Sequence, residues 1–300
     1  MSSDTYALIT PARNEEANIE STIRSVISQT LQPERWVIVS DASTDRTDEI
    51  VRRYAARHER IQLIRVNDDD SPRSFARQVS ATNIGFDAIR SLDCQFVGVL
   101  DGDVSFDSRY YERLLEEFRK NPRLGITGGT ILEGQDGQYA PRMWNAEQCV
   151  AGAIQLFRRQ CYEGIGGYIP LECGGQDAIA IEMARMQGWE VTSFPELGVL
   201  HHRRSGTAGT SLWRSQMRAG KAEYLLGYHP VFQALKCVRR LREKPHGVIS
   251  LLRFYGYWAA SVRRVQSPVP KDVVEYIRRG QMRRLRSVIS PSQKTGPAAA

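Results

Sequence analysis

Short apolar runs and amphipathic stretches alternate along the first part of the chain. Residues 6–10 (YALIT) and 36–39 (WVIV) are apolar, and each run is followed by proline or by polar residues, which is typical of buried strands. Between them, residues 17–29 repeat isoleucine and valine at three- and four-residue spacing, the period of an amphipathic helix. The order of strand, helix and strand predicts a βαβ unit with parallel strands.

The same alternation continues further along the chain. It predicts helices at 45–57, 83–92 and 110–119, and strands at 61–66 and 96–100. Helices that alternate with strands cover both faces of a parallel sheet, and ligands of such sheets bind at the carboxyl ends of the strands. We therefore predict an α/β fold with a mostly parallel sheet flanked by helices.

The second part of the chain has a different character. Glycine-rich loops lie among short apolar runs from residue 125 to about 205, which predicts a smaller β-rich half that covers the ligand site. Helical patterns then follow at 212–226, 231–242, 248–262 and 273–286. The predicted organisation is a domain over 1–205, with halves at 5–124 and 125–205, a helical extension over 206–288 and a disordered tail over 289–300.

Charge is distributed unevenly between these parts. Residues 1–202 carry 21 Lys and Arg against 30 Asp and Glu, a net −9, whereas residues 203–300 carry 20 against 4, a net +16. The composition, 41% hydrophobic and 25% charged, excludes a fibrous chain. The sequence also lacks 18 consecutive apolar residues, which excludes a polytopic membrane protein. The acidic and basic parts should have different tasks.

The cysteines and the N-terminus indicate a compartment. Five cysteines at irregular spacing, without a CxxC pair, argue against a disulfide framework and a zinc ribbon. The first residues lack the basic and apolar regions of a signal peptide, so we expect the mature chain to start where the sequence does. A reduced, cytoplasmic environment is predicted.

Acidic residues follow the predicted strands. Asp101, Gly102 and Asp103 come directly after the strand at 96–100, and two carboxylates flanking a glycine can hold a hard divalent cation that bridges a diphosphate. Such a triplet also occurs in solvated turns, but its place after a buried strand favours the metal site. Asp41 ends the second strand, where it can accept hydrogen bonds from a nucleobase or ribose, or cap a turn.

Other candidates admit two interpretations each. Glu15, in the loop after the first strand, can face the ligand crevice or be a first-turn helix acid. Asp177 can cap the helix that follows it or act as a general base. His201 and His202 end another predicted strand, where a neutral imidazole can be a metal ligand, although an exposed pair in a basic loop fits the local sequence too.

Six segments taken together resemble a known family. PARNEE, SDASTDRT, DGD, LFRR, GGQD and VLHHR occur in the order and at the spacings of family 2 glycosyltransferases, which have the GT-A fold. The resemblance covers about residues 5–205. It implies a catalytic domain with a nucleotide-binding half and an acceptor-side half. It also implies transfer of a sugar from a nucleotide-diphosphate donor, usually with inversion and with Mg²⁺ or Mn²⁺.

The resemblance also implies roles for single residues. Asp177 matches the catalytic base, although Gln176 stands where the family commonly has glutamate. The metal ligands would be Asp103 and His201, with His202 as the alternative. Acceptor contacts are expected from Trp144 and Gln176. The residues expected at the nucleotide sugar are Pro11, Arg13, Glu15, Asp41, Asp101 and Gly102.

The basic C-terminal segment is similar to the tails of bacterial polysaccharide-assembly glycosyltransferases. Its charge and aromatic residues suit an anionic membrane surface, although the same helices can simply pack on the catalytic domain. Nucleic acid is not expected as a partner, because the segment has no base-reading motif. We expect a cytoplasmic enzyme of cell-surface glycan synthesis, peripheral on the inner face of the plasma membrane, with a lipid-linked or free glycan as acceptor. A non-catalytic nucleotide-sugar or glycan-binding subunit is the alternative.

Overall fold

The computed structural model describes residues 4–66, 74–135, 138–141, 147–203, 212–242 and 247–289. The chain divides into two compact units, Met1–Gly209 and Thr210–Ala300. Residues 290–300 of the expected tail over 289–300, and the acceptor candidate Trp144, lie outside the described residues, whereas Ile289 is the last residue of a helix.

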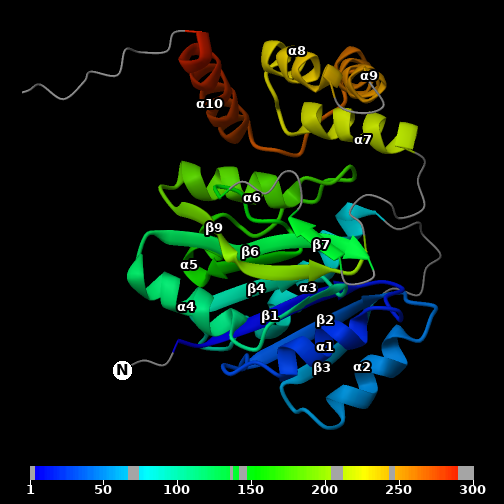
Figure 1. Cartoon of the computed structure of the whole chain (residues 1–300), viewed down its shortest axis with the longest axis vertical. Coiled ribbons are helices and arrows are strands. Elements are labelled where there is room, and N and C mark those ends of the chain that lie inside the picture. Colours follow the sequence, from blue (N-terminus) through cyan, green and yellow to red (C-terminus); the bar gives the residue numbers. More distant parts are fainter. Residues whose placement is uncertain are drawn as a thin grey trace, which may run out of the picture. The chain divides into compact units, whose positions relative to one another are not determined.

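The first unit alternates strands and helices (Figure 1). Its strands are β1 (Tyr6–Ala12), β2 (Arg35–Asp41), β3 (Ile61–Val66), β4 (Phe96–Leu100), β5 (Val104–Phe106), β6 (Leu124–Gln135), β7 (Gln138–Pro141), β8 (Ile154–Arg158) and β9 (Glu190–His201). Its helices are α1 (Ile19–Ile27), α2 (Thr47–Ala55), α3 (Phe75–Ile89), α4 (Tyr110–Lys120), α5 (Arg159–Gly164) and α6 (Gln176–Met186).

The described strands form one sheet in the order β3-β2-β1-β4-β8-β6-β9-β5, with β7 added to β6. The first four are parallel, as expected. Beyond β4 the sheet is mixed, because β8 runs antiparallel to β4 and β6 while β6 and β9 are parallel. Antiparallel neighbours need no crossover helix, and the described residues between β6 and β8 include none.

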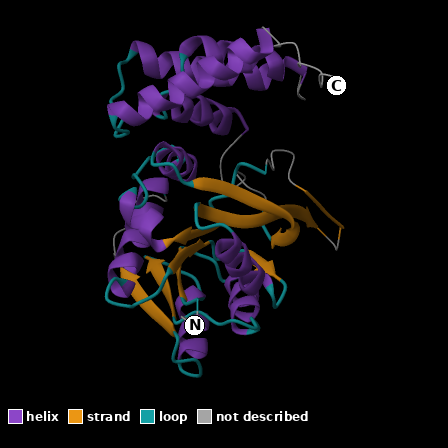
Figure 2. Cartoon of the chain, turned by 90° about the vertical axis from the view of Figure 1, so that its left-hand side faces the viewer, coloured by secondary structure: helices purple, strands orange, loops and turns teal. Residues whose placement is uncertain are grey.

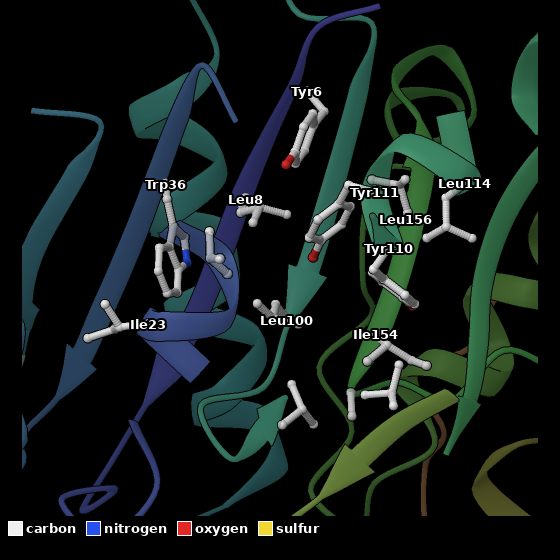
Figure 3. Close-up of a cluster of buried hydrophobic side chains, with 14 of the residues drawn as sticks. Tyr6, Leu8, Ile23, Trp36, Leu100, Tyr110, Tyr111, Leu114, Ile154 and Leu156 are labelled. Carbon is white, nitrogen blue, oxygen red and sulfur yellow. The ribbon is translucent and has the colours of Figure 1, made fainter. Parts of the chain in front are cut away.

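Helices cover both faces of this sheet (Figure 2). Alternate residues of β1 and β2, such as Leu8 and Trp36, pack with α1, α2 and α4 in one buried cluster. Figure 3 shows Ile23 beside Trp36, and Tyr111 near Tyr6 in the same cluster. The residues between them, such as Ile9, pack on the other face with α3. Because β1, β2 and β4 are parallel, their carboxyl ends meet at one edge of the sheet.

Helix α3 begins earlier than the sequence pattern indicated. It starts at Phe75, whereas the sequence pattern predicted a start at residue 83. Ser74 is the reason, because its hydroxyl accepts a hydrogen bond from the Arg77 N–H at 3.2 Å and so caps the first turn. The extra turns bring Arg77 and Gln78 to the edge of the sheet where the strands end.

The second unit consists, in its described part, of α7 (Leu212–Leu225), α8 (Pro230–Arg239), a 3-10 turn η1 (Arg240–Arg242), α9 (Val248–Val262) and α10 (Lys271–Ile289). These helices agree with the predicted ones. Helices α7 and α9 cross closely at Gly220 and Gly256, because a Cβ on Gly256 would lie 2.1 Å from the Met217 carbonyl oxygen. In the part of the chain that is described, each helix is too short or too polar to cross a bilayer.

Candidate active site

Strand register brings the DGD segment and the histidines together across about a hundred residues. Strand β5 follows Asp103 at once and pairs with the end of β9, so that Val104 lies opposite His201. The His202 N–H then donates to the Asp103 carbonyl oxygen at 2.9 Å. Thr22 of α1 fixes the same turn, since its hydroxyl donates to the Val104 carbonyl oxygen at 2.8 Å.

Asp101, Asp103 and His201 form a cluster with the geometry of a metal site. One ligand atom from each lies within 4.8 Å of the others. His201 Nε2 is 3.3 Å from Asp103 Oδ1, and both side chains are buried. Asp103 Oδ1 accepts no hydrogen bond from any described residue. Two carboxylates and an imidazole fit Mn²⁺ or Mg²⁺, so the residues present suit a divalent cation.

The side chain of His202 points away from the cluster that contains His201. Its Nε2 lies 2.9 Å from the Ser105 hydroxyl, and it does not belong to the cluster. Behind His201, Glu133 of β6 places Oε1 3.8 Å from Nδ1 of the ring. A carboxylate in that position can orient an imidazole ligand. The sequence reasoning missed Glu133, whose only signal is its register opposite His201 on β9.

Arg203 occupies the other side of Asp103. Its Nε and Nη2 donate to Asp103 Oδ2 at 3.0 and 2.9 Å, and Nη2 lies 2.5 Å from both carboxylate oxygens of Glu15. Glu15 is only 4% exposed, so the arginine neutralises a buried charge. The carboxylate of Glu15, expected at the nucleotide sugar, is therefore an ionic partner of Arg203.

The charges of this cluster change its proton affinities. Burial alone raises the pKa of Asp103, but His201 and Arg203 outweigh burial and hold that pKa below its ordinary value. Burial likewise lowers the pKa of His201, yet the close contact with the charge of Asp103, together with Asp101 and Glu133, raises it overall. The pKa of His202 is lowered, mainly by burial.

A second cluster forms where β1 and β2 end. Asp41 accepts hydrogen bonds from Arg77 through both oxygens, at 2.5 and 2.9 Å, and Arg13 Nη1 lies 3.4 Å from Oδ2. Gln78 donates to Asp101 Oδ1 at 3.1 Å and so connects the two clusters. Arg77 and Gln78 were missed from sequence, because the helix that carries them was predicted to start later.

The loops at these strand ends adopt uncommon backbone conformations. Asn14 and Ala42 have φ of 54° and 51°, a left-handed region that costs energy for a residue with a Cβ. The two loops hold each other, because Asn14 Oδ1 accepts from the Thr44 N–H at 2.8 Å and Ser43 accepts from the Asn14 N–H at 3.2 Å. Strained backbone of this kind often accompanies functional sites.

Two remaining candidates, Pro11 and Gly102, affect the backbone around the site. Pro11 lies within β1 opposite Val39, and β1 ends at Ala12, directly before Arg13. A Cβ on Gly102 would lie 3.1 Å from Ile19 Cδ1 and 3.4 Å from Glu15 Cγ. Glycine at 102 thus lets the side chains of α1 and Glu15 approach the DGD turn.

Asp177 lies at the start of α6. It contacts Gly152, which shortly precedes β8, the neighbour of β4 in the sheet. Its Oδ2 accepts a hydrogen bond from the Gly152 N–H at 3.2 Å. The adjacent Ala153 carbonyl oxygen accepts from the Asp101 N–H at 2.9 Å. Two consecutive residues therefore connect Asp177 to Asp101. A side chain at Gly152 would meet Asp177, because its Cβ would lie 2.9 Å from that of Asp177.

Gln176 precedes Asp177 as the first residue of α6. Its Oε1 is buried and has no hydrogen-bond partner among the residues that are described. A buried amide oxygen without a donor is costly unless a ligand or water satisfies it. The side chain is thus suited to accept a hydrogen bond beside Asp177.

The sequence model of Glycosyl transferase family 2 matches residues 7–175, more than half of the chain. The chain belongs to this family. The expected family is therefore confirmed. The matched range includes Asp41, Asp101 and Asp103, whereas Asp177, His201 and Arg203 lie beyond its end.

Curated relatives carry names from glycan synthesis. The uncharacterized glycosyltransferase EpsJ of Bacillus subtilis is 34% identical over 144 residues, which are 47% of this chain and 39% of that protein. Poly-beta-1,6-N-acetyl-D-glucosamine synthase of Staphylococcus epidermidis is 27% identical over 171 residues, 51% of this chain and 39% of the relative. Glycosyltransferase AglE of Haloferax volcanii is 25% identical over 72% of each chain. The chain spans well under half the length of the first two relatives.

Solved structures share the fold. A mannosyltransferase from Pyrobaculum calidifontis, in complex with GDP-Man and Mn²⁺, superposes with a TM-score of 0.54 at 16% identity over 95% of this chain and 81% of that one. TarS 1-349 of S. aureus in complex with UDP-GlcNAc gives 0.55 at 14% identity over 95% and 82%. The expected GT-A α/β fold is confirmed by these similarities.

Proposed function

We propose that this protein is a metal-dependent, inverting glycosyltransferase that uses a nucleotide-diphosphate sugar. The observation that carries the proposal is the convergence of Asp101, Asp103 and His201 beside Asp177, which is joined to Asp101 through residues 152 and 153. A cation site beside a carboxylate at a helix start suits sugar transfer from a diphosphate, because the cation can stabilise the departing charge and the carboxylate can accept a proton.

The donor would lie along the carboxyl ends of β1, β2 and β4. The cluster of Asp41, Arg77 and Arg13 offers both donors and acceptors to a nucleobase or ribose. Asp101 and Gly102 would face the ribose and diphosphate. Arg203 is the nearest fixed cation to the DGD turn among the described contacts, and it can stabilise phosphate charge.

Asp103 and His201 would hold Mn²⁺ or Mg²⁺, with Asp101 beside them. A bound divalent cation supplies charge stabilisation to a departing diphosphate. Glu133 would orient the His201 ring, and Arg203 would keep Asp103 turned so that Oδ1 faces the cation. The chain would thus offer the cation one carboxylate oxygen, Asp103 Oδ1, and one imidazole nitrogen, His201 Nε2.

Asp177 would be the general base of a single displacement. It takes the proton from an acceptor hydroxyl, the oxygen forms a bond to the anomeric carbon, and the bond from that carbon to the diphosphate oxygen breaks with its electron pair. The Gly152 N–H holds the carboxylate in place. Gln176, with its buried Oε1, would accept a hydrogen bond from the acceptor sugar. Trp144 stays an acceptor candidate from the sequence.

The relatives support a task in cell-surface polysaccharide synthesis, because one of them is named a poly-beta-1,6-N-acetyl-D-glucosamine synthase. A glycan or lipid-linked glycan acceptor follows from that class. We place the enzyme in the cytoplasm and on the inner face of the plasma membrane, on the strength of the basic charge of its C-terminal part. A non-catalytic donor-binding subunit is the alternative, and it predicts binding without transfer.

The first test is a thermal-shift panel with UDP-, GDP-, dTDP-, CMP- and ADP-sugars, each with Mn²⁺ and with EDTA. A donor that binds only the folded protein raises its melting temperature. We expect one nucleotide class to stabilise the chain with Mn²⁺ and not with EDTA. Stabilisation that is equal in EDTA would contradict the metal role of the cluster.

Asp177→Asn separates an enzyme from a binding subunit. Loss of the base should lower nucleoside-diphosphate release by about 10²–10⁴-fold, while the metal-dependent thermal shift with the donor stays as in the wild type. Asp87→Asn, an exposed change on α3, is a matched control. Donor binding without measurable release in the wild type would favour the subunit.

A further inference from the structure

Large exposed hydrophobic side chains are concentrated in one part of the molecule. Among the described residues, all of those that are exposed lie between 213 and 262, in the second unit. In the described part of the first unit, large apolar side chains are covered at least in part. Scattered exposed apolar residues are ordinary, but a concentration of them marks an interaction surface.

Helix α9 presents five of them as a single stripe. Residues 251, 254, 255, 258 and 262 recur at the spacing of one helical face, and they are leucine, phenylalanine, tyrosine, tryptophan and valine. Leu251 is 66% exposed and Val262 is 77% exposed. A helix face that looks to solvent is normally polar.

The opposite face of α9 is already engaged. Ser250, Gly256, Tyr257 and Ala260 are buried, Gly256 packs against the backbone of α7, and Tyr257 makes an edge contact with Tyr224 at 5.6 Å. The helix is therefore fixed by one apolar face and carries a second one that the rest of its unit leaves uncovered.

Helix α8 repeats the arrangement beside it. Val231, Leu235 and Val238 are exposed at positions i, i+4 and i+7, while Gln233 and Cys237 on the other side are buried. Helices α8 and α9 are in contact, and η1 with exposed Leu241 contacts both. We call residues 231, 235, 238, 241, 251, 254, 255, 258 and 262 the apolar face.

The surroundings of the apolar face are strongly basic. Residues 230–264 include eight Lys and Arg and a single acidic residue, Glu243. Arg239, Arg263 and Arg264 are exposed at the ends of α8 and α9. Residues 210–300 carry 18 Lys and Arg against 4 Asp and Glu, a net +14. A second copy of this surface would be repelled by that charge, whereas an anionic surface would be attracted.

We propose that the apolar face is a membrane-docking surface that inserts into the headgroup region of an anionic lipid bilayer, with α8 and α9 lying in its plane. The chemistry matches both layers of such a surface. Basic side chains meet anionic headgroups, and Trp258, Tyr255 and Phe254 suit the boundary between headgroups and acyl chains. At 15 residues, α9 is about 22 Å long, which suits an in-plane position.

Insertion of the apolar face goes beyond electrostatic adsorption of a basic segment, and it does not depend on the reaction proposed for the first unit. Salt separates the two modes of binding, because screening weakens attraction between exposed charges and leaves apolar insertion in place. The test therefore measures vesicle binding at two salt concentrations with variants that keep every charge.

The experiment uses the full chain and co-sedimentation with phosphatidylcholine vesicles, with and without phosphatidylglycerol, at about 0.1 M and about 0.5 M NaCl. The test variant is Leu251→Gln/Tyr255→Gln/Trp258→Gln. The matched control, Leu251→Met/Tyr255→Phe/Trp258→Phe, keeps the face apolar. We expect wild type and control to bind phosphatidylglycerol vesicles at both salt concentrations, and the Gln variant to bind about tenfold or more weakly at the higher one.

Four results would overturn the proposal. The Gln variant could bind at high salt like the wild type, or the wild type could fail to bind phosphatidylglycerol vesicles. The third is a lower melting temperature of the Gln variant without vesicles, and the fourth is loss of a dimer seen by light scattering, since either would show that protein covers the face. The donor-dependent thermal shift is read in parallel, and it should be unchanged in all three proteins because their first units are identical.

Discussion

Glu223 of the second unit and Asp103 of the first are both buried among charged side chains, and the two carboxylates differ in how they are satisfied. In the second unit, Glu223 accepts from Gln233 through Oε2 at 2.5 Å and from Lys236 through Oε1 at 2.7 Å. In the first unit, Asp103 Oδ2 is held by Arg203, while Oδ1 accepts no hydrogen bond from a described residue and faces His201.

This difference is the one expected between a structural ion pair and the cation site that we propose. Around Glu223 the cations Lys236 and Arg253 balance the carboxylate, the latter at 3.7 Å, so the cluster ties α7, α8 and α9 together. Around Asp103 the carboxylates outnumber the cations, since Glu15, Asp101 and Glu133 are close as well. An excess of oriented carboxylate oxygen is what a divalent cation requires.

The largest expected effect comes from Asp103→Asn. The amide removes the negative charge that faces His201, so we expect transfer to fall by about 10³-fold or more and the Mn²⁺-dependent thermal shift to disappear. Measurement of nucleoside-diphosphate release and of the melting temperature with Mn²⁺ checks both. Retained Mn²⁺ dependence would mean that the cation binds elsewhere.

Glu223→Ala is the converse experiment on the other cluster. The substitution leaves Lys236 and Arg253 without their buried carboxylate partner. It should therefore lower the free energy of unfolding of the second unit by about 3 kcal/mol. Donor binding should not change. Denaturant melts give the free energy, and Glu275→Ala, an exposed acid on α10, is the matched control. Reduced donor affinity in Glu223→Ala would show that the clusters are not independent.

Arg203→Gln tests whether a cation can replace the arginine. The variant leaves the buried carboxylate of Glu15 without its ionic partner, which should lower the stability of the metal-free protein by about 2 kcal/mol. Mn²⁺ should then raise the melting temperature more than in the wild type, because the ion supplies the missing positive charge. An equal Mn²⁺ shift in both proteins would contradict the role of Arg203 as a counter-cation for this cluster.

Ala42→Gly should have the smallest effect. Glycine adopts the left-handed conformation at φ 51° without a Cβ penalty, so we expect the free energy of unfolding to rise by about 0.5–1 kcal/mol. Val39→Gly, at a buried strand position nearby, should do the reverse. A loss of stability in Ala42→Gly, measured in urea, would show that the loop is not strained.

The local sequence located the first strands of the sheet and several residues of the candidate site. Apolar runs stopped by polar residues located β1, β2 and β4, and the acidic residues that follow those runs located Asp41 and Asp101. The physical reason is that a parallel strand buried on both faces has a near-continuous apolar sequence. It failed for the start of α3, because a single cap at Ser74 determines that start, and the apolar periodicity is weak there.

The sequence by itself determined which side chains could do chemistry, since carboxylates and imidazoles at strand ends are recognisable from neighbouring residues. Only the tertiary structure decided their partners. The pairing of β5 with β9 brings His201 to Asp103 and Arg203 to Glu15 across most of the first unit. In the second unit, the packing of α9 on α7 through Gly256 leaves the apolar face of α8 and α9 uncovered within that unit. Contacts of this kind depend on strand register and on which helix faces pack, and neither is fixed by neighbours along the chain.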